Sequence, residues 1–137
     1  MIKTDILIIG AGPTGLFAVF EAGLLKLKCH LIDALPQPGG QLAGDLVNNL
    51  MEQIKPFDPG FTLGDRAETL EKQEDGNFIV TTTRGVKHQA PIVVIAGGLG
   101  SFEPRKPPIP VIGNYEDKGV AYIIRDPEVY RDKRVVI

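Results

Sequence analysis

The sequence predicts an α/β fold with a parallel central sheet, helices on both faces and a small antiparallel β-meander as an insertion. Two wholly apolar runs, residues 5–9 and 92–96, are typical of strands that a parallel sheet buries on both faces. Glycines within residues 10–15 separate the first run from apolar residues at helical spacing, which indicates a strand, a tight turn and a crossover helix. Asp75-Gly76 lies between two strand-like segments and predicts a hairpin.

The first β-α-β unit is expected to comprise the strand at 5–9, a helix from Leu16 to about Lys28 and a strand at 29–33. The later elements are expected in this order: a loop at 36–41, a helix at 42–56, strands at 61–64, 66–74, 77–83, 86–89 and 92–96, a proline-rich extended connector at 103–110, a strand at 120–124, a helical turn at 127–131 and the start of another buried strand at 134–137. The apolar stripe of the helix at 42–56 is assigned to Leu46, Leu50, Met51 and Ile54.

Composition narrows the class of protein. With 137 residues the chain can form one ordinary domain with its own core, and we assign residues 1–137 to a single domain. One cysteine excludes an intramolecular disulfide, a CxxC redox pair and a multi-cysteine metal site. A net charge of −2 argues against a general nucleic-acid binder. No apolar run approaches the ~18 residues of a membrane span, and the first residues lack a signal-peptide pattern, so we expect a cytoplasmic protein without a membrane partner.

The motif with the most chemical content is Gly10-Ala11-Gly12-Pro13-Thr14-Gly15, which fits G-x-G-x-x-G between a strand and a helix. Asp33 ends the next strand, where dinucleotide-binding domains carry the acid that binds a ribose 2′-hydroxyl. Gly10 would allow the tight turn, Gly12 would leave room for a pyrophosphate, and Gly15 would let the helix pack closely on the strand. The pattern predicts a Rossmann-like site for FAD or NAD rather than NADP, because Asp33 would repel a 2′-phosphate. The alternative is a glycine turn that binds nothing.

Two other glycine segments are weaker signals. Ala96-Gly97-Gly98 ends an apolar strand, and these small residues would let the strand end approach a cofactor. An ordinary glycine pair between a strand and a loop explains them equally well. Gly39-Gly40-Gln41 offers an accessible backbone and an amide that both donates and accepts, or it is a plain loop.

The other reactive residues have no supporting pattern. Cys29 lies inside a predicted strand and is interpreted as a small buried hydrophobe. His30 and His88 are far apart in the sequence, without metal-ligand spacing, and both are interpreted as incidental. Basic clusters at 105–106 and 131–134 fit a solvated face or contact with an acidic protein. Spacing supports no Ser–His–Asp triad and no catalytic carboxylate pair.

Several motifs together resemble a known family. They are residues 4–15, Asp33, residues 38–41 and 93–98, Gly100-Ser101-Phe102-Glu103-Pro104-Arg105-Lys106, Gly119-Val120-Ala121-Tyr122 and Asp126-Pro127-Glu128. In this order they resemble the two-dinucleotide-domain flavoproteins of the thioredoxin reductase type. The resemblance is closer to the ferredoxin/flavodoxin–NADP reductase branch, which lacks a CxxC pair.

The resemblance implies FAD as the cofactor and assigns roles to individual residues. Residues 10–15 would hold the pyrophosphate, Asp33 would bind the adenosine ribose, and Ala67 would contact the adenine through its backbone. Gln41 and Phe102 would lie near the flavin. In the family, FAD takes a hydride from NADPH and passes single electrons to ferredoxin or flavodoxin.

The sequence departs from the family in two places. After residues 40–42 the family has a loop with a tyrosine that packs on the isoalloxazine ring, whereas this sequence continues directly into the next helix. Residues 117–137 resemble the connector to a second glycine fingerprint, which binds NADPH, and the sequence ends before that fingerprint. We therefore expect a shortened or engineered chain without an NADPH site. The strand at 134–137 would expose an edge, which a homodimer or strand exchange would cover.

Three hypotheses of function follow. The favoured one is the FAD-binding part of an NADPH-dependent ferredoxin or flavodoxin reductase, inactive or weakly active by itself. The alternative is a non-catalytic module that binds FAD, NAD or ADP. A minimal NAD-dependent dehydrogenase has the least support, because no acid–base residue is placed to serve a substrate.

Overall fold

The computed structural model describes residues 1–40, 44–98, 100, 106–116, 118–122 and 127–136. The chain divides into two compact units, Met1–Ser101 and Phe102–Ile137, and each is described by itself. Within the described residues, the first unit contains all the α-helices and strands, and the second contains short 3-10 helices.

A parallel sheet lies at the centre of the first unit, with the strand order β4-β3-β2-β8. Its strands are Ile6–Ile9 (β2), Cys29–Asp33 (β3), Gly60–Leu63 (β4) and Ile92–Ile95 (β8). β2 pairs in parallel with β3 on one side and with β8 on the other. Its neighbouring residues Leu7 and Ile8 face opposite sides of the sheet, and both are fully buried. The predicted parallel strand with two buried faces is confirmed.

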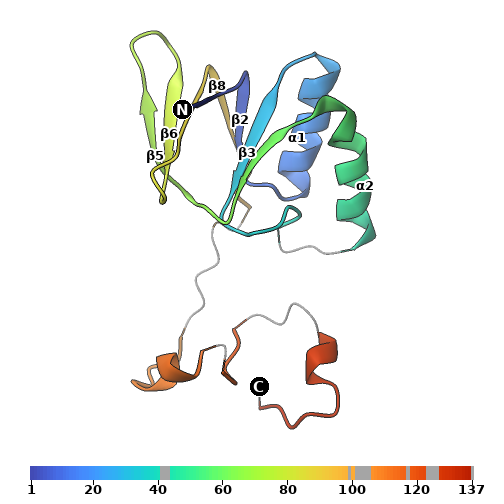
Figure 1. Ribbon diagram of the computed structural model, residues 1–137, viewed down its shortest axis with the longest axis vertical. Coiled ribbons are helices and arrows are strands. Elements are labelled where there is room, and N and C mark those ends of the chain that lie inside the picture. Colours follow the sequence, from blue (N-terminus) through green and yellow to red (C-terminus); the bar gives the residue numbers. More distant parts are fainter. Residues whose placement is uncertain (41–43, 99, 101–105, 117, 123–126, 137) are drawn as a thin grey trace. The chain divides into compact units, whose positions relative to one another are not determined.

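Two helices cover one face of this sheet, α1 (Pro13–Leu24) and α2 (Asp45–Ile54) (Figure 1). A 3-10 turn, η1 (Lys55–Phe57), follows α2. Ile8 of β2 and Leu31 of β3 belong to the same buried cluster as residues of both helices. The Phe57 ring lies so close to α1 that a Cβ on Gly23 would overlap it. Close packing of η1 therefore needs a glycine in the last turns of α1.

The β-meander covers the opposite face. Its antiparallel strands are β5 (Ala67–Lys72), β6 (Phe78–Thr82) and β7 (Lys87–Ala90), and β1 (Ile2–Lys3) pairs in parallel with β7, which completes a sheet in the order β1-β7-β6-β5. A second buried cluster joins Leu7 and Ile32 of the parallel sheet to Val80 and Ala90 of the meander. The predicted α/β class with an antiparallel insertion is confirmed. The expectation of helices on both faces was wrong for the described residues, where the meander covers the second face. Apolar residues at alternate positions of the meander strands pack against Leu7 and Ile32 there.

The helices are shorter than their apolar patterns predict. α1 ends at Leu24 rather than near Lys28, because Lys26 adopts a left-handed conformation (φ +61°) and the Leu27 amide donates to the Ala22 carbonyl. In α2, Val47 is buried and Leu46 is 54% exposed, so assigning Leu46 to the apolar stripe was wrong. At 100° per residue, Val47 lies nearer than Leu46 to the centre of the face that Leu50 and Ile54 bury. No helix in the described parts of the chain is long and apolar enough to span a membrane.

The second unit contains η2 (Ile112–Tyr115) and η3 (Pro127–Tyr130), and the latter confirms the predicted helical turn. Of the strand expected at 120–124, Val120 makes an isolated bridge to Glu116, and residues 123–126 lie outside the described residues. The strand expected to start at 134 was wrong, since residues 134–136 form no strand and Val136 is 98% exposed. Its apolar composition suits a strand, but the described residues of this unit offer no strand for it to pair with.

An exposed strand edge does occur, at β8 of the first unit. Among the described residues β8 pairs with β2 alone, and Ile95 is 76% exposed. With no strand at 134–136, the homodimer expected to cover an edge there has no such edge to cover, and dimerisation of the chain stays a prediction. Size-exclusion chromatography with light scattering at several concentrations would measure it, and a monomeric mass throughout would contradict it.

Candidate nucleotide-binding site

The predicted site residues that the structure describes lie near the carboxyl ends of the four strands of the parallel sheet. The glycine loop follows β2, Asp33 ends β3, residues 64–67 follow β4, and Ala96-Gly97 follow β8. Contacts join these segments: the Ala11 amide bonds to the Asp33 side chain, and the Ala96 amide donates to the carbonyl of Ile9. In open parallel sheets, ligands bind in the crevice at the carboxyl ends of the strands.

The three glycines of the loop have different surroundings. Gly10 has a φ of +110°, and a Cβ on it would overlap the Ala96 carbonyl oxygen. A Cβ on Gly15 would overlap the Gly10 carbonyl oxygen. Gly12 has an ordinary φ of −74°, and, apart from its neighbours in the chain, no atom of the described residues lies within 4 Å of a Cβ placed on it. The chain's own packing therefore requires Gly10 and Gly15, whereas at Gly12 the missing side chain leaves open space beside the loop.

The amino end of α1 borders this open space. Gly12 is the N-cap and Pro13 is the first helical residue, and no side chain of the described residues caps the helix. The amides of Thr14 and Gly15 are in the first turn, where the helix itself provides no acceptor. A helix N-terminus carries a partial positive charge and is suited to an anion such as a phosphate.

The Asp33 carboxylate is held by two main-chain amides. Ala11 N–H donates to Oδ2 at 2.6 Å, and Leu35 N–H donates to Oδ1 at 2.8 Å. Asp33 thereby joins the end of β3 to the glycine loop. A carboxylate has about four lone-pair sites, so two remain for hydroxyl groups of a ribose.

The segment at 39–40 also lies against the glycine loop. Gly39 N–H donates to the Ala11 carbonyl at 2.7 Å, and a Cβ on Gly40 would be 3.4 Å from the Gly12 Cα. The plain-loop interpretation misses this contact, which depends on the positive φ angles of both glycines, +112° and +64°. Gln41 and Phe102, expected near a flavin, lie outside the described residues.

Ala67, expected near an adenine, is the first residue of β5 and pairs with Thr82 at an irregularity in the strand register. It packs against the buried cluster of Leu7 and Ile32. Gly97 lies after β8, and a Cβ on it would meet no atom within 4 Å in the part of the chain that the structure describes. The structure therefore places Ala67 and Gly97 beside the strand ends, and their contact with a ligand stays a prediction.

Sequence reasoning missed a polar cluster between the two sheets. The imidazoles of His30 and His88 both bond through Nε2 to the Thr62 hydroxyl, at 2.8 and 2.9 Å, with ring centroids 4.9 Å apart. Thr62 has one proton to donate, so at least one imidazole must donate its own N–H. The available signal was that His30 stands among the apolar, buried residues 29–32 of β3. Its partners come from β4 and β7, which local spacing cannot indicate.

Burial controls the ionisation of this cluster. It lowers the pKa of His30 from 6.5 to about 4, and the nearby His88 adds to that shift. Burial lowers the pKa of His88 as well. Cys29, interpreted as a buried hydrophobe, is 6% exposed, and burial raises the pKa of its thiol to about 11. The two histidines are therefore neutral and Cys29 is a thiol at neutral pH, so this interior carries no charge of theirs.

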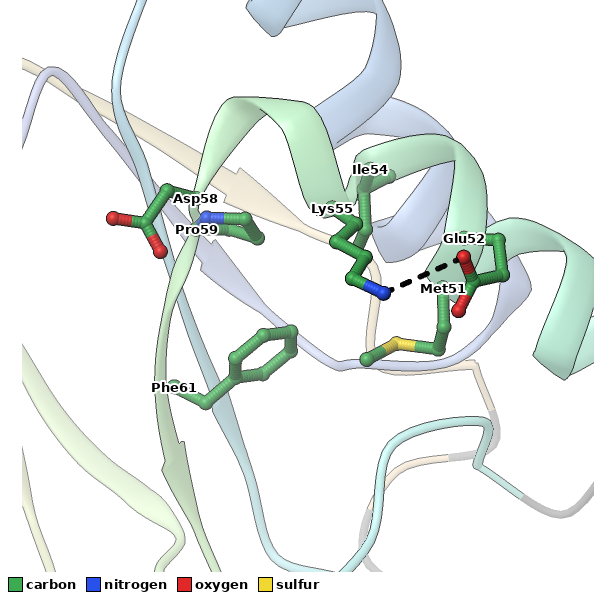
Figure 2. A pocket seen from close by; sticks show the side chains of 7 residues that line it. All are labelled: Met51, Glu52, Ile54, Lys55, Asp58, Pro59 and Phe61. Atoms are coloured by element: carbon green, nitrogen blue, oxygen red, sulfur yellow. Dashed lines mark ion pairs between the residues drawn. The ribbon is translucent and has the colours of Figure 1, made fainter.

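A separate hollow of about 360 Å³ lies between α2, η1 and β4 (Figure 2). Met51 and Phe61 form an apolar side of it, and Lys55 pairs with Glu52 at 3.7 Å on its rim. The hollow lies where β4 begins, whereas the glycine loop lies where β2 ends. Because these strands are parallel, the two sites lie at opposite ends of the strands. It shares no residue with the candidate site.

A parallel sheet with a glycine loop at a helix N-terminus and an acid at the end of the next strand defines a Rossmann-type dinucleotide-binding fold. The chain is 78% identical over 156 aligned residues to ferredoxin–NADP reductase 1 of Christiangramia forsetii. It is 69% identical to a ferredoxin–NADP reductase of Flavobacterium johnsoniae. The alignments cover all of this chain and 44% and 45% of those proteins. The resemblance to the ferredoxin–NADP reductases is confirmed, and the chain spans less than half of their length.

A thioredoxin reductase from Gloeobacter violaceus superposes with a TM-score of 0.60 at 19% identity, over 88% of this chain and 44% of that one, which shows the shared fold. A comparison with models of protein families finds no match.

The alignment to the Christiangramia protein runs over 156 residues, more than the 137 of this chain, so the relative has residues without a counterpart here. The prediction of a shortened chain is confirmed.

Proposed function

We propose that the chain binds FAD through its adenosine diphosphate half, as the FAD-binding part of a ferredoxin–NADP reductase. The observation that carries this proposal is the open space at Gly12, which lies at the uncapped end of α1. A pyrophosphate there would accept hydrogen bonds from the amides of Thr14 and Gly15. Asp33 would then hold the ribose from the neighbouring strand, at a position already determined by its bonds to Ala11 and Leu35.

Reduction of ferredoxin with NADPH is proposed for the longer protein of which this chain resembles a part. FAD, when bound, would supply the hydride acceptor and the one-electron donor. The residues of this chain would bind and orient the adenosine end of FAD. We assign neither the NADPH site nor the ferredoxin or flavodoxin contact to these residues. Alone, the chain is expected to be inactive or weakly active. Its cytoplasmic location stays a prediction.

The direct test is flavin binding by the purified chain. The protein should show flavin absorption bands as isolated, or should quench the fluorescence of added FAD in a saturable manner. If the chain showed neither flavin absorption nor quenching at saturating FAD, the proposed function would be rejected.

A second candidate is a module that binds any adenine dinucleotide. It is favoured by the position of the described contacts, since the loop, the α1 terminus and Asp33 would all contact the ADP portion. Equal affinities for FAD, NAD and ADP would favour this module. Tighter binding of FAD than of ADP would favour the flavoprotein.

Replacement of Asp33 by alanine should weaken FAD binding by about 1–3 kcal/mol, the scale of hydrogen bonds to a charged group, or ~5- to 150-fold in the dissociation constant. The change would remove the ribose acceptor and release the Ala11 amide. Calorimetry with FAD would measure it. The matched control is Asp5→Ala, which removes a carboxylate that accepts from the Lys28 amide at the other end of the sheet. Equal affinities of the two variants would contradict the role of Asp33.

A further inference from the structure

We propose that Asp65 is a positioning residue for the adenosine end of the nucleotide site, holding the segment at 64–67 against Asp33. The inference rests on the proposed function. Asp65 is 3% exposed, and neither the glycine motif nor the family resemblance assigned it a role. It lies between β4 and β5, at the end of the strands that carries the glycine loop.

The side chain of Asp65 holds the turn between β6 and β7. The Thr82 hydroxyl donates to Oδ2 at 2.5 Å, and the Thr83 hydroxyl donates to Oδ1 at 2.8 Å. The Arg84 amide donates to Oδ1 at 3.1 Å. Three donors from consecutive residues on one carboxylate make a rigid connection between this segment and the meander.

The main chain around Asp65 holds the end of β3. The Asp65 amide donates to the Asp33 carbonyl at 3.1 Å, and the Gly64 amide donates to the Leu35 carbonyl at 2.9 Å. Because the Asp33 carboxylate accepts from Ala11, a continuous series of hydrogen bonds runs from the glycine loop through Asp33 and Asp65 to the β6–β7 turn. Asp65 thus determines where Ala67 lies relative to the expected ribose site.

Charge on Asp65 contributes to this arrangement. Burial alone would raise the pKa of its carboxyl, but the hydrogen bonds from Thr82, Thr83 and Arg84 outweigh burial and lower the pKa. The side chain is therefore a carboxylate at neutral pH and accepts from every donor that surrounds it. An asparagine at this position has the same size and would retain the acceptor Oδ1. Its NH₂ group would replace Oδ2, so the Thr82 hydroxyl would lose the acceptor of its proton.

The other meander turn supplies a matched control. Asp75 accepts from the Asn77 amide at 2.9 Å and from Asn77 Nδ2 at 2.8 Å, and these hydrogen bonds lower its pKa as well. Its bonds remain within the β5–β6 hairpin and do not reach Asp33. Asp75→Asn therefore makes the same chemical change beyond the other end of β5, at an exposed position, without touching the proposed series of bonds.

The experiment compares the dissociation constants of ADP and inorganic pyrophosphate for the full chain and for the Asp65→Asn and Asp75→Asn variants, at a temperature where all are folded by circular dichroism. Pyrophosphate needs the glycine loop and the α1 terminus, whereas ADP also needs the adenosine contacts. We expect Asp65→Asn to weaken ADP about tenfold and leave pyrophosphate unchanged, and Asp75→Asn to change neither.

Three outcomes would overturn the inference. Unchanged ADP affinity in Asp65→Asn would mean that Asp65 has no positioning role. Equal weakening of ADP and pyrophosphate would mean general damage to the fold. If the parent chain binds neither ligand nor FAD, the proposed function itself fails, and the inference fails with it. Should Asp65→Asn not fold, Thr83→Val removes one donor to Oδ1 and should produce a smaller change of the same selectivity.

Discussion

A Gly12→Val variant should fold like the parent chain and lose detectable binding of FAD and ADP. A Cβ at this position would meet no atom of the described residues within 4 Å, and the φ of −74° suits any residue, so folding should be unaffected. The branched side chain would instead fill the space where the pyrophosphate is proposed to approach the backbone. The circular dichroism spectrum measures the first expectation, and a calorimetric titration with FAD measures the second.

Gly113→Val is the control for this substitution. Gly113 lies in η2, and a Cβ there would likewise meet no described atom within 4 Å, so the same side chain is added to open space in the other unit. This variant should bind FAD as the parent does. An unchanged FAD dissociation constant in Gly12→Val would reject the assignment of the pyrophosphate to this loop.

Acid should destabilise the chain through its buried histidines. The pKa of His30 is 6.5 for the free side chain and about 4 in the folded protein, so between these values the unfolded state binds more protons. The free energy of unfolding should therefore fall as the pH drops from 6.5 toward 4, by up to about 3 kcal/mol for His30. Above pH 6.5 the imidazole is neutral in both states, and no loss is expected.

The His30→Gln variant isolates this contribution. Its amide can still bond to Thr62 but does not titrate, so its unfolding free energy should depend less steeply on pH between 6.5 and 4.5. Urea unfolding of both proteins across this range measures the difference. His88 is present in both proteins, so its own contribution to the pH dependence is retained. Burial lowers the pKa of His88, the Asp65 carboxylate raises it, and the Met1 ammonium lowers it. Parallel pH curves would contradict the proposed source of the instability.

The parts of this fold that could be predicted are those determined by residues close together in the sequence. The strand at 29–33 was placed at its observed bounds because its apolar run ends at a charged residue. The turn at Gly10 could be predicted because its positive φ requires glycine within a short motif. The segment at 134–136 has equally strand-like residues, yet strand formation depends on a pairing partner that composition does not supply.

The parts that could not be predicted depend on contacts between distant segments. His30 meets Thr62 and His88 because β3 pairs with β4 in one register, His30 opposite Gly60, and the meander packs above them. A Cβ on Gly60 would overlap the His30 ring, so a glycine on another strand makes room for this imidazole. Asp65 gains its role in the same way, from three donors about twenty residues later in the chain.

The central claim is that an adenosine diphosphate group binds where the glycine loop meets α1, and an NMR titration tests it most directly. ADP would be added stepwise to ¹⁵N-labelled protein and the amide shifts followed residue by residue. We predict saturable changes that are largest at residues 10–15 and 33–35. The absence of any shift at saturating ADP, or shifts concentrated around Met51 and Phe61 at the opposite end of the strands, would contradict the claim.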